Sequence, residues 1–266
     1  MALLSLWGAA AICLVMVMGV AWIVQHRTGQ GGWADAFWSY GLGLVGVGVA
    51  LIPLNDAPPS ARQWVTAGLI GLWGLRLGSH IAHRAAHEVE DARYASLRRD
   101  WGSDYQTKMF GFLMLQAGAG ALLVLSILMA ARNPNAGLTV QDGFAILVFT
   151  AALVGESLAD RQLAAFKSDP ANRGRVCDTG LWAWSRHPNY FFEWLCWCAW
   201  PVFAIDFSGK WPWGWLAVTG PIYIYWLLTR VSGIPLLEAH MGRSRPEAFE
   251  AYAARTSRFF PRRPKD

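Results

Sequence analysis

Apolar residues along this chain are gathered into seven stretches, each about as long as a helix that crosses a membrane. The stretches cover residues 3–24, 36–54, 64–81, 109–131, 143–163, 190–207 and 211–230. A helix needs ~20 mostly apolar residues to cross the hydrocarbon of a bilayer. The pattern therefore predicts an all-α, polytopic integral membrane protein with about seven transmembrane helices.

The polar segments between these stretches are mostly short, and no Gly/Ser linker, low-complexity tract or internal repeat divides them. We therefore predict a single transmembrane domain over residues 1–266, with two longer loops at 82–108 and 164–189 and a polar tail at 231–266. Pro170, Gly174 and Gly180 predict that the second loop is not one continuous helix. An amphipathic run at 245–258 predicts a helix lying on the membrane surface.

The distribution of positive charge predicts the orientation of the chain. Of its 23 Lys and Arg residues, 19 fall in segments on one side of the membrane and 3 on the other when the N-terminus is placed outside. Because cytoplasmic loops are enriched in Lys and Arg, we expect the N-terminus outside and the C-terminus in the cytoplasm. The net charge of +5 suits an anionic inner leaflet and requires no nucleic-acid partner.

A metal site is not indicated. The four cysteines contain no CxxC pair and have no zinc-type spacing to histidine, so neither a zinc site nor a disulfide framework is expected. His80, His83 and His87 share one helical face, but no carboxylate stands at matching spacing. A helix face in contact with water explains them more simply.

The run Ser185-Arg186-His187-Pro188-Asn189-Tyr190, with Glu193 one turn later, stands at the start of the sixth apolar stretch. Placing Arg or Glu near hydrocarbon costs ~2.5–3.5 kcal/mol, so such residues usually have partners or line a water-filled site. Interfacial anchoring explains a single Arg or His, but not six polar groups together. This run is our main candidate for a functional site.

Other charges lie at or within the apolar stretches. Glu156 and Asp160 are four residues apart and share a helical face, while Arg76 and Asp35 lie within and at the edge of early stretches. Ionisable groups in a membrane are functional candidates. A helix-to-helix ion pair, for example between Asp35 and Arg76, is the structural alternative.

The expected cytoplasmic face gathers cations next to amide and carboxylate groups. Such a set suits a ligand with phosphates at one end and polar heteroatoms at the other, such as a dinucleotide. No GxGxxG loop and no Walker-type loop is present, so a nucleotide would not be held by a soluble-type fold. The set comprises Lys167, Arg173, Arg175, Arg186, His187, Asn189 and the arginines of the tail.

Several motifs resemble those of the steroid 5-alpha-reductase-like membrane proteins, above all the large uncharacterised bacterial branch of that superfamily. The specific block runs from 160 to 193, and the similarity extends over nearly the whole chain. The motifs are Asp160-x-Gln162, Phe166-Lys167, Asn172-Arg173-Gly174, Asp178-x-Gly180-Leu181-Trp182, the run from Ser185 to Tyr190 with Glu193, Trp73-x-x-Arg76-Leu77, Glu90-Asp91-x-Arg93-Tyr94 and Phe260-Pro261.

The resemblance implies a seven-helix protein of the bacterial inner membrane. Such a protein would bind NADPH from the cytoplasm and reduce a conjugated carbon–carbon double bond in a lipophilic, steroid- or isoprenoid-like substrate. It implies Asp35, Glu193 and Tyr190 as catalytic residues. The cofactor-binding residues that follow from it and from the cationic face are Asp160, Lys167, Arg173, Arg175, Arg186, His187 and Asn189.

The chain departs from the reductase pattern in its last helix, where Arg230-Val231-Ser232-Gly233 replaces a histidine-rich stretch, and no tyrosine matches the reductases' substrate tyrosine. The Arg-His-Pro-x-Tyr run is also similar to that of the isoprenylcysteine carboxyl methyltransferase-like proteins. Their tail typically carries paired glutamates, whereas this chain has only Glu238. A membrane methyltransferase that uses S-adenosylmethionine is therefore the alternative function.

Overall fold

The computed structural model describes residues 1–54, 57–87, 91–135 and 137–264. The described residues are helices joined by turns and loops, and they contain no strand. The chain divides into two compact units, which we describe separately: residues 1–140 with 200–219, and residues 141–199 with 220–266. The single domain expected from the sequence stays a prediction.

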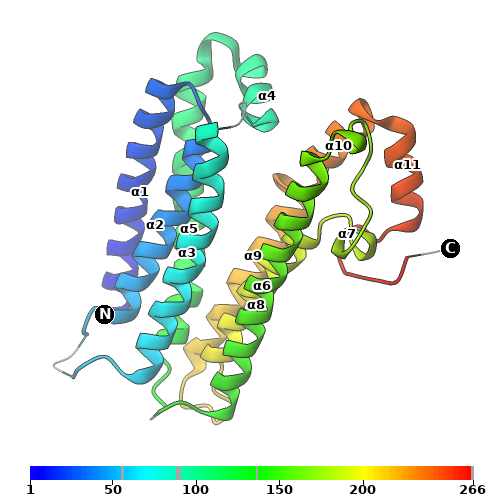
Figure 1. Ribbon diagram of the computed structural model, residues 1–266. Helices are drawn as coiled ribbons and strands as arrows, with labels where there is room; N and C mark the ends of the chain where they lie inside the picture. Colours follow the sequence, from blue (N-terminus) through cyan, green and yellow to red (C-terminus); the bar gives the residue numbers. More distant parts are fainter. Residues whose placement is uncertain (55–56, 88–90, 136, 265–266) are drawn as a thin grey trace. The chain divides into compact units, whose positions relative to one another are not determined.

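The first unit is a bundle of long helices, shown from blue to green in Figure 1. Its elements are α1 (Ala2–Thr28), α2 (Gly32–Leu51), α3 (Ala61–His87), α4 (Ala92–Trp101), η1 (Gly102–Asp104), α5 (Tyr105–Ala131) and η3 (Pro212–Val218). Gly29 ends α1 in the left-handed conformation, at φ 72°, and donates its N–H to Gln25 O at 2.9 Å. Glycine adopts this conformation without steric cost, which explains the sharp turn into α2.

Glycines allow α2 and α3 to pack closely. A Cβ built on Gly74 would lie 2.8 Å from Gly43 Cα and 3.1 Å from Ser39 O, so any side chain there would push the two backbones apart. Tyr40 and Ser79 join the same helices by a hydroxyl–hydroxyl hydrogen bond of 2.9 Å. Small residues at such crossings are the usual way in which membrane helices gain packing contacts.

The second unit contains α6 (Val140–Ser168), η2 (Pro170–Asn172), α7 (Leu181–Trp184), the greater part of α8 (Pro188–Ala204), α9 (Thr219–Trp226), η4 (Leu227–Val231, a π-helical turn), α10 (Ile234–Ser244) and α11 (Pro246–Arg255). Its long helices α6 and α8 are neighbours, because Cys196 Sγ contacts Phe149 O at 3.9 Å and Gly155 leaves room for the Phe192 ring. The shorter helices α7, α10 and α11 gather at one end of this unit (Figure 1).

Apolar side chains on the long helices remain exposed in the folded chain. Ile12 is 63% exposed on α1, Leu75 is 63% exposed on α3 and Leu147 is 64% exposed on α6. Soluble proteins rarely leave large contiguous apolar surfaces in water. The helices therefore face lipid, and the chain is a membrane protein.

Each of the seven expected stretches is helical over most of its length. Four helical stretches of the described chain are long and apolar enough to cross a membrane: Ala2–Thr28, Gly32–Leu51, Arg93–Ala131 and Val140–Ser168. Among the other three, α3 carries several polar residues and α8 has only 17 residues. The last stretch, 211–230, is divided between η3, α9 and η4.

Helix ends account for much of the two expected loops. The loop 82–108 is largely helical, since α3 continues to His87 and α4 begins at Ala92; Glu90 of its motif lies outside the described residues. In the loop 164–189, α6 ends at Ser168, while Gly174 and Gly180 have φ angles of 82° and 59°. The interruption expected at these glycines is thus confirmed, and so is the helix expected in the tail, as α11.

Candidate functional site

The Arg-His-Pro run lies in the second unit, in the short connection between α7 and α8. Pro188 is the first residue of α8, a position where proline costs no hydrogen bond and fixes a helical φ. Ahead of it, the Ser185 hydroxyl donates to Phe259 O at 2.8 Å and the Arg186 N–H donates to Ser257 O at 2.8 Å. The C-terminal segment therefore holds the run in place through its backbone.

Helix α11 strengthens this attachment. The buried Tyr252 hydroxyl donates to Trp182 O at 2.6 Å and lies 3.3 Å from Ser185 O. The Arg186 guanidinium donates to Ala253 O at 3.0 Å and lies over the Phe249 ring. An ion pair between Arg255 and Asp178 joins α11 to the loop before α7. The face of α11 that carries Phe249, Tyr252 and Ala253 thus packs on the connection that contains the run.

Glu238 of α10 is the centre of the polar network. Its Oε1 accepts hydrogen bonds from Arg186 Nε at 2.9 Å and from His187 Nε2 at 3.2 Å. Its Oε2 accepts from Arg258 Nε at 3.1 Å. One carboxylate therefore binds groups from the run and from the C-terminal segment.

The environment sets the protonation states in this network. Burial lowers the pKa of His187 below its usual 6.5, against the opposing effect of Glu238. Burial by itself raises the pKa of Glu238. The hydrogen bond with His187 and the charges of Arg186 and Arg258 lower it by more, so the net shift of this pKa is downward. A neutral imidazole beside an ionised carboxylate donates its Nε2–H, which leaves Nδ1 as a hydrogen-bond acceptor.

The next turn of α8 carries the other residues of the run. Asn189 Nδ2 donates to Asp160 Oδ1 of α6 at 3.2 Å, and the Tyr190 ring stacks on the His187 imidazole at a centroid distance of 5.7 Å. Glu193 is buried and accepts a hydrogen bond from Trp197 Nε1 at 2.8 Å. The structure thus brings Asp160, Asn189, Tyr190 and His187 together, with Glu193 one turn further along α8.

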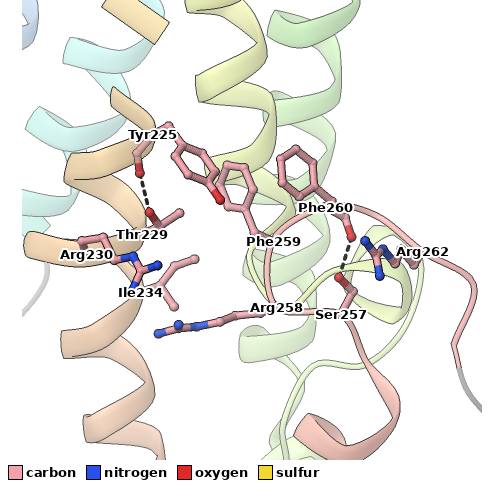
Figure 2. A pocket seen from close by; sticks show the side chains of 9 residues that line it. All are labelled: Tyr225, Thr229, Arg230, Ile234, Ser257, Arg258, Phe259, Phe260 and Arg262. Carbon is pink, nitrogen blue, oxygen red and sulfur yellow. Dashed lines mark hydrogen bonds between the residues drawn. The ribbon is translucent and has the colours of Figure 1, made fainter. Parts of the chain in front are cut away.

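A cavity of about 310 Å³ opens beside this network (Figure 2). Arginines from two different segments line it: Arg230 comes from the π-helical turn η4, while Arg258 and Arg262 come from the C-terminal segment. Aromatic rings of Tyr225, Phe259 and Phe260 form another part of its lining, as Figure 2 shows. The combination of guanidinium groups and rings suits an anion attached to a planar or apolar group.

Arg230 belongs to the π-helical turn η4, whose backbone is closely packed where the turn ends. Gly233 follows it, and a Cβ on Gly233 would lie 2.5 Å from Leu228 O. Thr229, buried in the same turn, donates its hydroxyl to Tyr225 O at 2.6 Å. Single π-helical turns occur frequently at functional sites. Of the Arg-Val-Ser-Gly sequence that replaces the histidine-rich stretch, Arg230 lines the cavity.

The remaining cations of the expected set lie in the last turn of α6, which carries Lys167, and in the loop after it, which carries Arg173 and Arg175. Lys167, Arg173 and Arg175 are exposed there, and Arg175 donates to Asn172 Oδ1 at 3.3 Å. Among the described residues, no hydrogen bond or ion pair joins these three to the Glu238 network. Their assignment to a phosphate site stays a prediction.

Asp35 lies in the first unit, at the start of α2. Its Oδ2 accepts from Arg93 at 2.7 Å and its Oδ1 accepts from the Tyr94 hydroxyl at 2.8 Å. The ion-pair partner of Asp35 is thus Arg93 rather than Arg76. A buried tyrosine beside this carboxylate was missed in the sequence, although Tyr94 belongs to one of the motifs that carry the resemblance.

Sequence reasoning also missed the central position of Glu238, which stood out only as half of an incomplete glutamate pair. Arg258 and Arg262 were recognised only as tail arginines. Neither role has a sequence signal of its own, because the partners lie 20 to 52 residues away along the chain.

Comparison with known proteins supports a family assignment without a known activity. The chain is 27% identical over 230 residues to "Uncharacterized protein C594.04c" of Schizosaccharomyces pombe, an alignment that covers 76% of this chain and 64% of the relative. The chain therefore spans less than two thirds of that relative's length. No solved structure matches the chain significantly. Residues 21–256 match the family described as "Protein of unknown function (DUF1295)", and the chain belongs to this family.

Proposed function

We propose that this membrane protein is an NADPH-dependent reductase of a conjugated carbon–carbon double bond in a lipophilic, steroid- or isoprenoid-like substrate. The proposal joins the motif resemblance to the steroid 5-alpha-reductase-like superfamily with the chemistry of the second unit. Its main support is the cavity lined by Arg230, Arg258 and Arg262.

The composition of that cavity favours a phosphate-bearing ligand. Guanidinium groups bind phosphate oxygens in a bidentate manner, and these hydrogen bonds are stronger than those between neutral groups. NADPH carries three phosphate groups as well as aromatic rings that can stack on Tyr225 or Phe260. At about 310 Å³, the cavity would hold a phosphate-bearing part of the dinucleotide rather than the whole molecule.

Within this proposal, NADPH supplies the hydride. The chain's residues bind and orient: Arg230, Arg258 and Arg262 hold phosphate, and the Asn189–Asp160 pair offers amide and carboxylate groups to the polar end of the cofactor. In the first unit, the resemblance implies Asp35, which accepts the Tyr94 hydroxyl, as a further catalytic residue. The exposed apolar helix faces would let the substrate enter from the bilayer, with the cofactor coming from the cytoplasm of a bacterial cell, where the positive-inside rule puts the C-terminus.

The alternative is a membrane methyltransferase that uses S-adenosylmethionine. The observation that favours it is the binding of Glu238 to both Arg186 and His187, since a tail glutamate and an Arg-His-Pro-x-Tyr run occur together in that class. Against it, S-adenosylmethionine has no phosphate and carries a positive sulfonium, which three arginines would repel.

The small molecule that copurifies with the protein discriminates between the two. We expect mass spectrometry to find a dinucleotide, whereas S-adenosyl compounds would support the methyltransferase. In detergent, NADPH should bind more tightly than NADH if arginines contact its additional phosphate, since each charge-assisted hydrogen bond contributes ~1.5–3 kcal/mol. Equal binding of both, or binding of neither, would contradict the proposal.

Two sets of variants locate the site. Arg230→Gln and Arg262→Gln should weaken NADPH binding, while Arg243→Gln, an exposed arginine of α10 outside the cavity, should leave it unchanged. Asn189→Ala and Glu193→Gln should lower binding or turnover with expression and helix content intact. If these last two variants unfold, the residues are structural.

A further inference from the structure

The carboxylate of Glu238 connects the Arg-His-Pro run to the cavity. Its side chain is only 15% exposed, and both oxygens are occupied: Oε1 by Arg186 and His187, and Oε2 by Arg258. The three donors come from two segments that are far apart in sequence. Without the carboxylate, the Arg186 guanidinium, whose side chain is only 11% exposed, would lose its anion while the half-exposed Arg258 cation stays on the same side of the network, which is unfavourable for a buried charge.

The way in which Arg258 is held leaves part of its guanidinium available. Glu238 binds it through Nε, and among the described residues no hydrogen bond engages its two terminal nitrogens. The same side chain lines the cavity, and Figure 2 shows it reaching from the C-terminal segment toward Ile234 and Arg230. A guanidinium fixed at Nε presents its terminal N–H groups in one plane, as bidentate phosphate binding requires.

We propose that Glu238 is a positioning residue for ligand binding. It fixes the guanidinium of Arg258 at the cavity and ties it, through one carboxylate, to Arg186 and His187. The cavity is thereby able to bind a phosphate or pyrophosphate group. This inference rests on the proposed function in that the phosphate is taken to belong to NADPH. It names a residue outside the motif, on a different helix, as the group that organises the anion site.

An amide cannot replace this carboxylate. Gln at position 238 has one oxygen and one NH₂ group, so its NH₂ would face either Arg258 Nε or the Arg186–His187 pair, and in each case two donors would oppose each other. Asp keeps the charge and both oxygens but is one methylene shorter. We therefore expect Glu238→Gln to disorder Arg258 and Glu238→Asp to restore part of its position.

The test measures anion binding by the full chain in detergent with two probes, NADPH and inorganic pyrophosphate. Glu238→Gln should weaken the binding of both by about tenfold or more, and Glu238→Asp should recover part of the loss. Glu250→Gln, an exposed carboxylate of α11, is the matched control and should bind like the parent protein.

A double-mutant cycle tests whether Glu238 acts through Arg258. If it does, the Glu238→Gln/Arg258→Gln double variant should bind pyrophosphate within about twofold of the Arg258→Gln single variant, because the two losses are not independent. Additive losses would overturn the inference. So would a Glu238→Gln variant that melts at a lower temperature but binds normally while folded, since that outcome describes a merely structural residue.

The two probes separate this inference from the proposed function. Pyrophosphate binding with non-additive losses, together with no binding of NADPH, would retain the role of Glu238 and refute the reductase. Failure of both probes to bind to the folded parent protein would overturn the inference itself, because no anion site would then exist to be organised.

Discussion

The close crossing of α2 and α3 gives the sharpest test of the fold. Gly74→Ala places a Cβ 2.8 Å from Gly43 Cα and 3.1 Å from Ser39 O. Both neighbours are backbone atoms, so the conflict cannot be relieved by a side-chain rotation and the two helices must separate. Overpacking of this kind typically costs 1–3 kcal/mol. The hydrogen bond between Tyr40 and Ser79, one turn further along α3, should be strained by the same displacement.

The matched control is Gly68→Ala on the same helix. Gly68 is exposed, and a Cβ there meets no atom within 4 Å. Replacing an exposed helical glycine with alanine is neutral or stabilises by up to about 1 kcal/mol. Thermal unfolding in detergent, followed by helix content, should therefore give a lower Tm for Gly74→Ala and an equal or higher Tm for Gly68→Ala. Equal melting of the two variants would refute the packing argument.

Further predictions concern the polar contacts. Tyr252→Phe removes the hydroxyl that donates to Trp182 O at 2.6 Å and should destabilise the protein by about 1–3 kcal/mol, as expected for a buried acceptor left unsatisfied; Tyr223→Phe, whose hydroxyl makes no hydrogen bond to the described residues, is the control, and Tm is the measurement. Because the folded pKa of His187 lies below 6.5, the unfolded chain binds the proton more readily and stability should fall as the pH drops below about 6.5; a His187→Gln variant should show a smaller fall in Tm between pH 7.5 and pH 5.5, and an identical fall would contradict the assignment. Asp35→Asn weakens the contacts to Arg93 and Tyr94 and should lower Tm, as should Tyr94→Phe. If Asp35 also takes part in catalysis, the turnover of the Asp35→Asn variant well below its Tm should fall by about 10² or more, as general acid–base residues usually contribute; normal turnover of this variant would remove Asp35 from the site. Gly180→Ala introduces a side chain at φ 59° and against Gln162, whose Oε1 accepts the Leu181 N–H at 2.9 Å; we expect a lower Tm for it than for Gly137→Ala, which has a positive φ but no atom within 4 Å of the built Cβ.

The helices follow directly from the order of residues along the chain. Each of the seven apolar stretches is mostly helical, because in a membrane the backbone of such a segment must satisfy its own hydrogen bonds. The glycines that interrupt the segment after α6 also act locally. Gly174 and Gly180 have φ angles of 82° and 59°, which glycine adopts without steric cost and which are strained for other residues. The match of residues 21–256 to one family also reflects motifs that can be read without a structure.

Partnerships between distant polar residues could not be derived in this way. A pair between Asp35 and Arg76 was the structural alternative for these two charges, but α4 instead brings Arg93 and Tyr94 to the two oxygens of Asp35. The sequence separation is 58 and 59 residues, and no local periodicity encodes which of several arginines folds back to a given carboxylate. Lys167, Arg173 and Arg175 look equivalent to the tail arginines in the sequence, yet Arg230, Arg258 and Arg262 are the ones that line the described cavity.

The sequence by itself determined that this is an all-helical membrane protein and that polar chemistry gathers around the Arg-His-Pro run, because hydrophobic length and the cost of charges in hydrocarbon are properties of single segments. Only the tertiary structure decided that Glu238 joins that run to Arg258 and that a π-helical turn presents Arg230 to the same cavity. Those arrangements depend on how the C-terminal segment packs on the connection between α7 and α8, through backbone hydrogen bonds such as Arg186 N–H to Ser257 O. Nearly every residue carries the same backbone N–H and C=O groups, so the pattern of side chains does not predict which backbone groups will form these long-range hydrogen bonds.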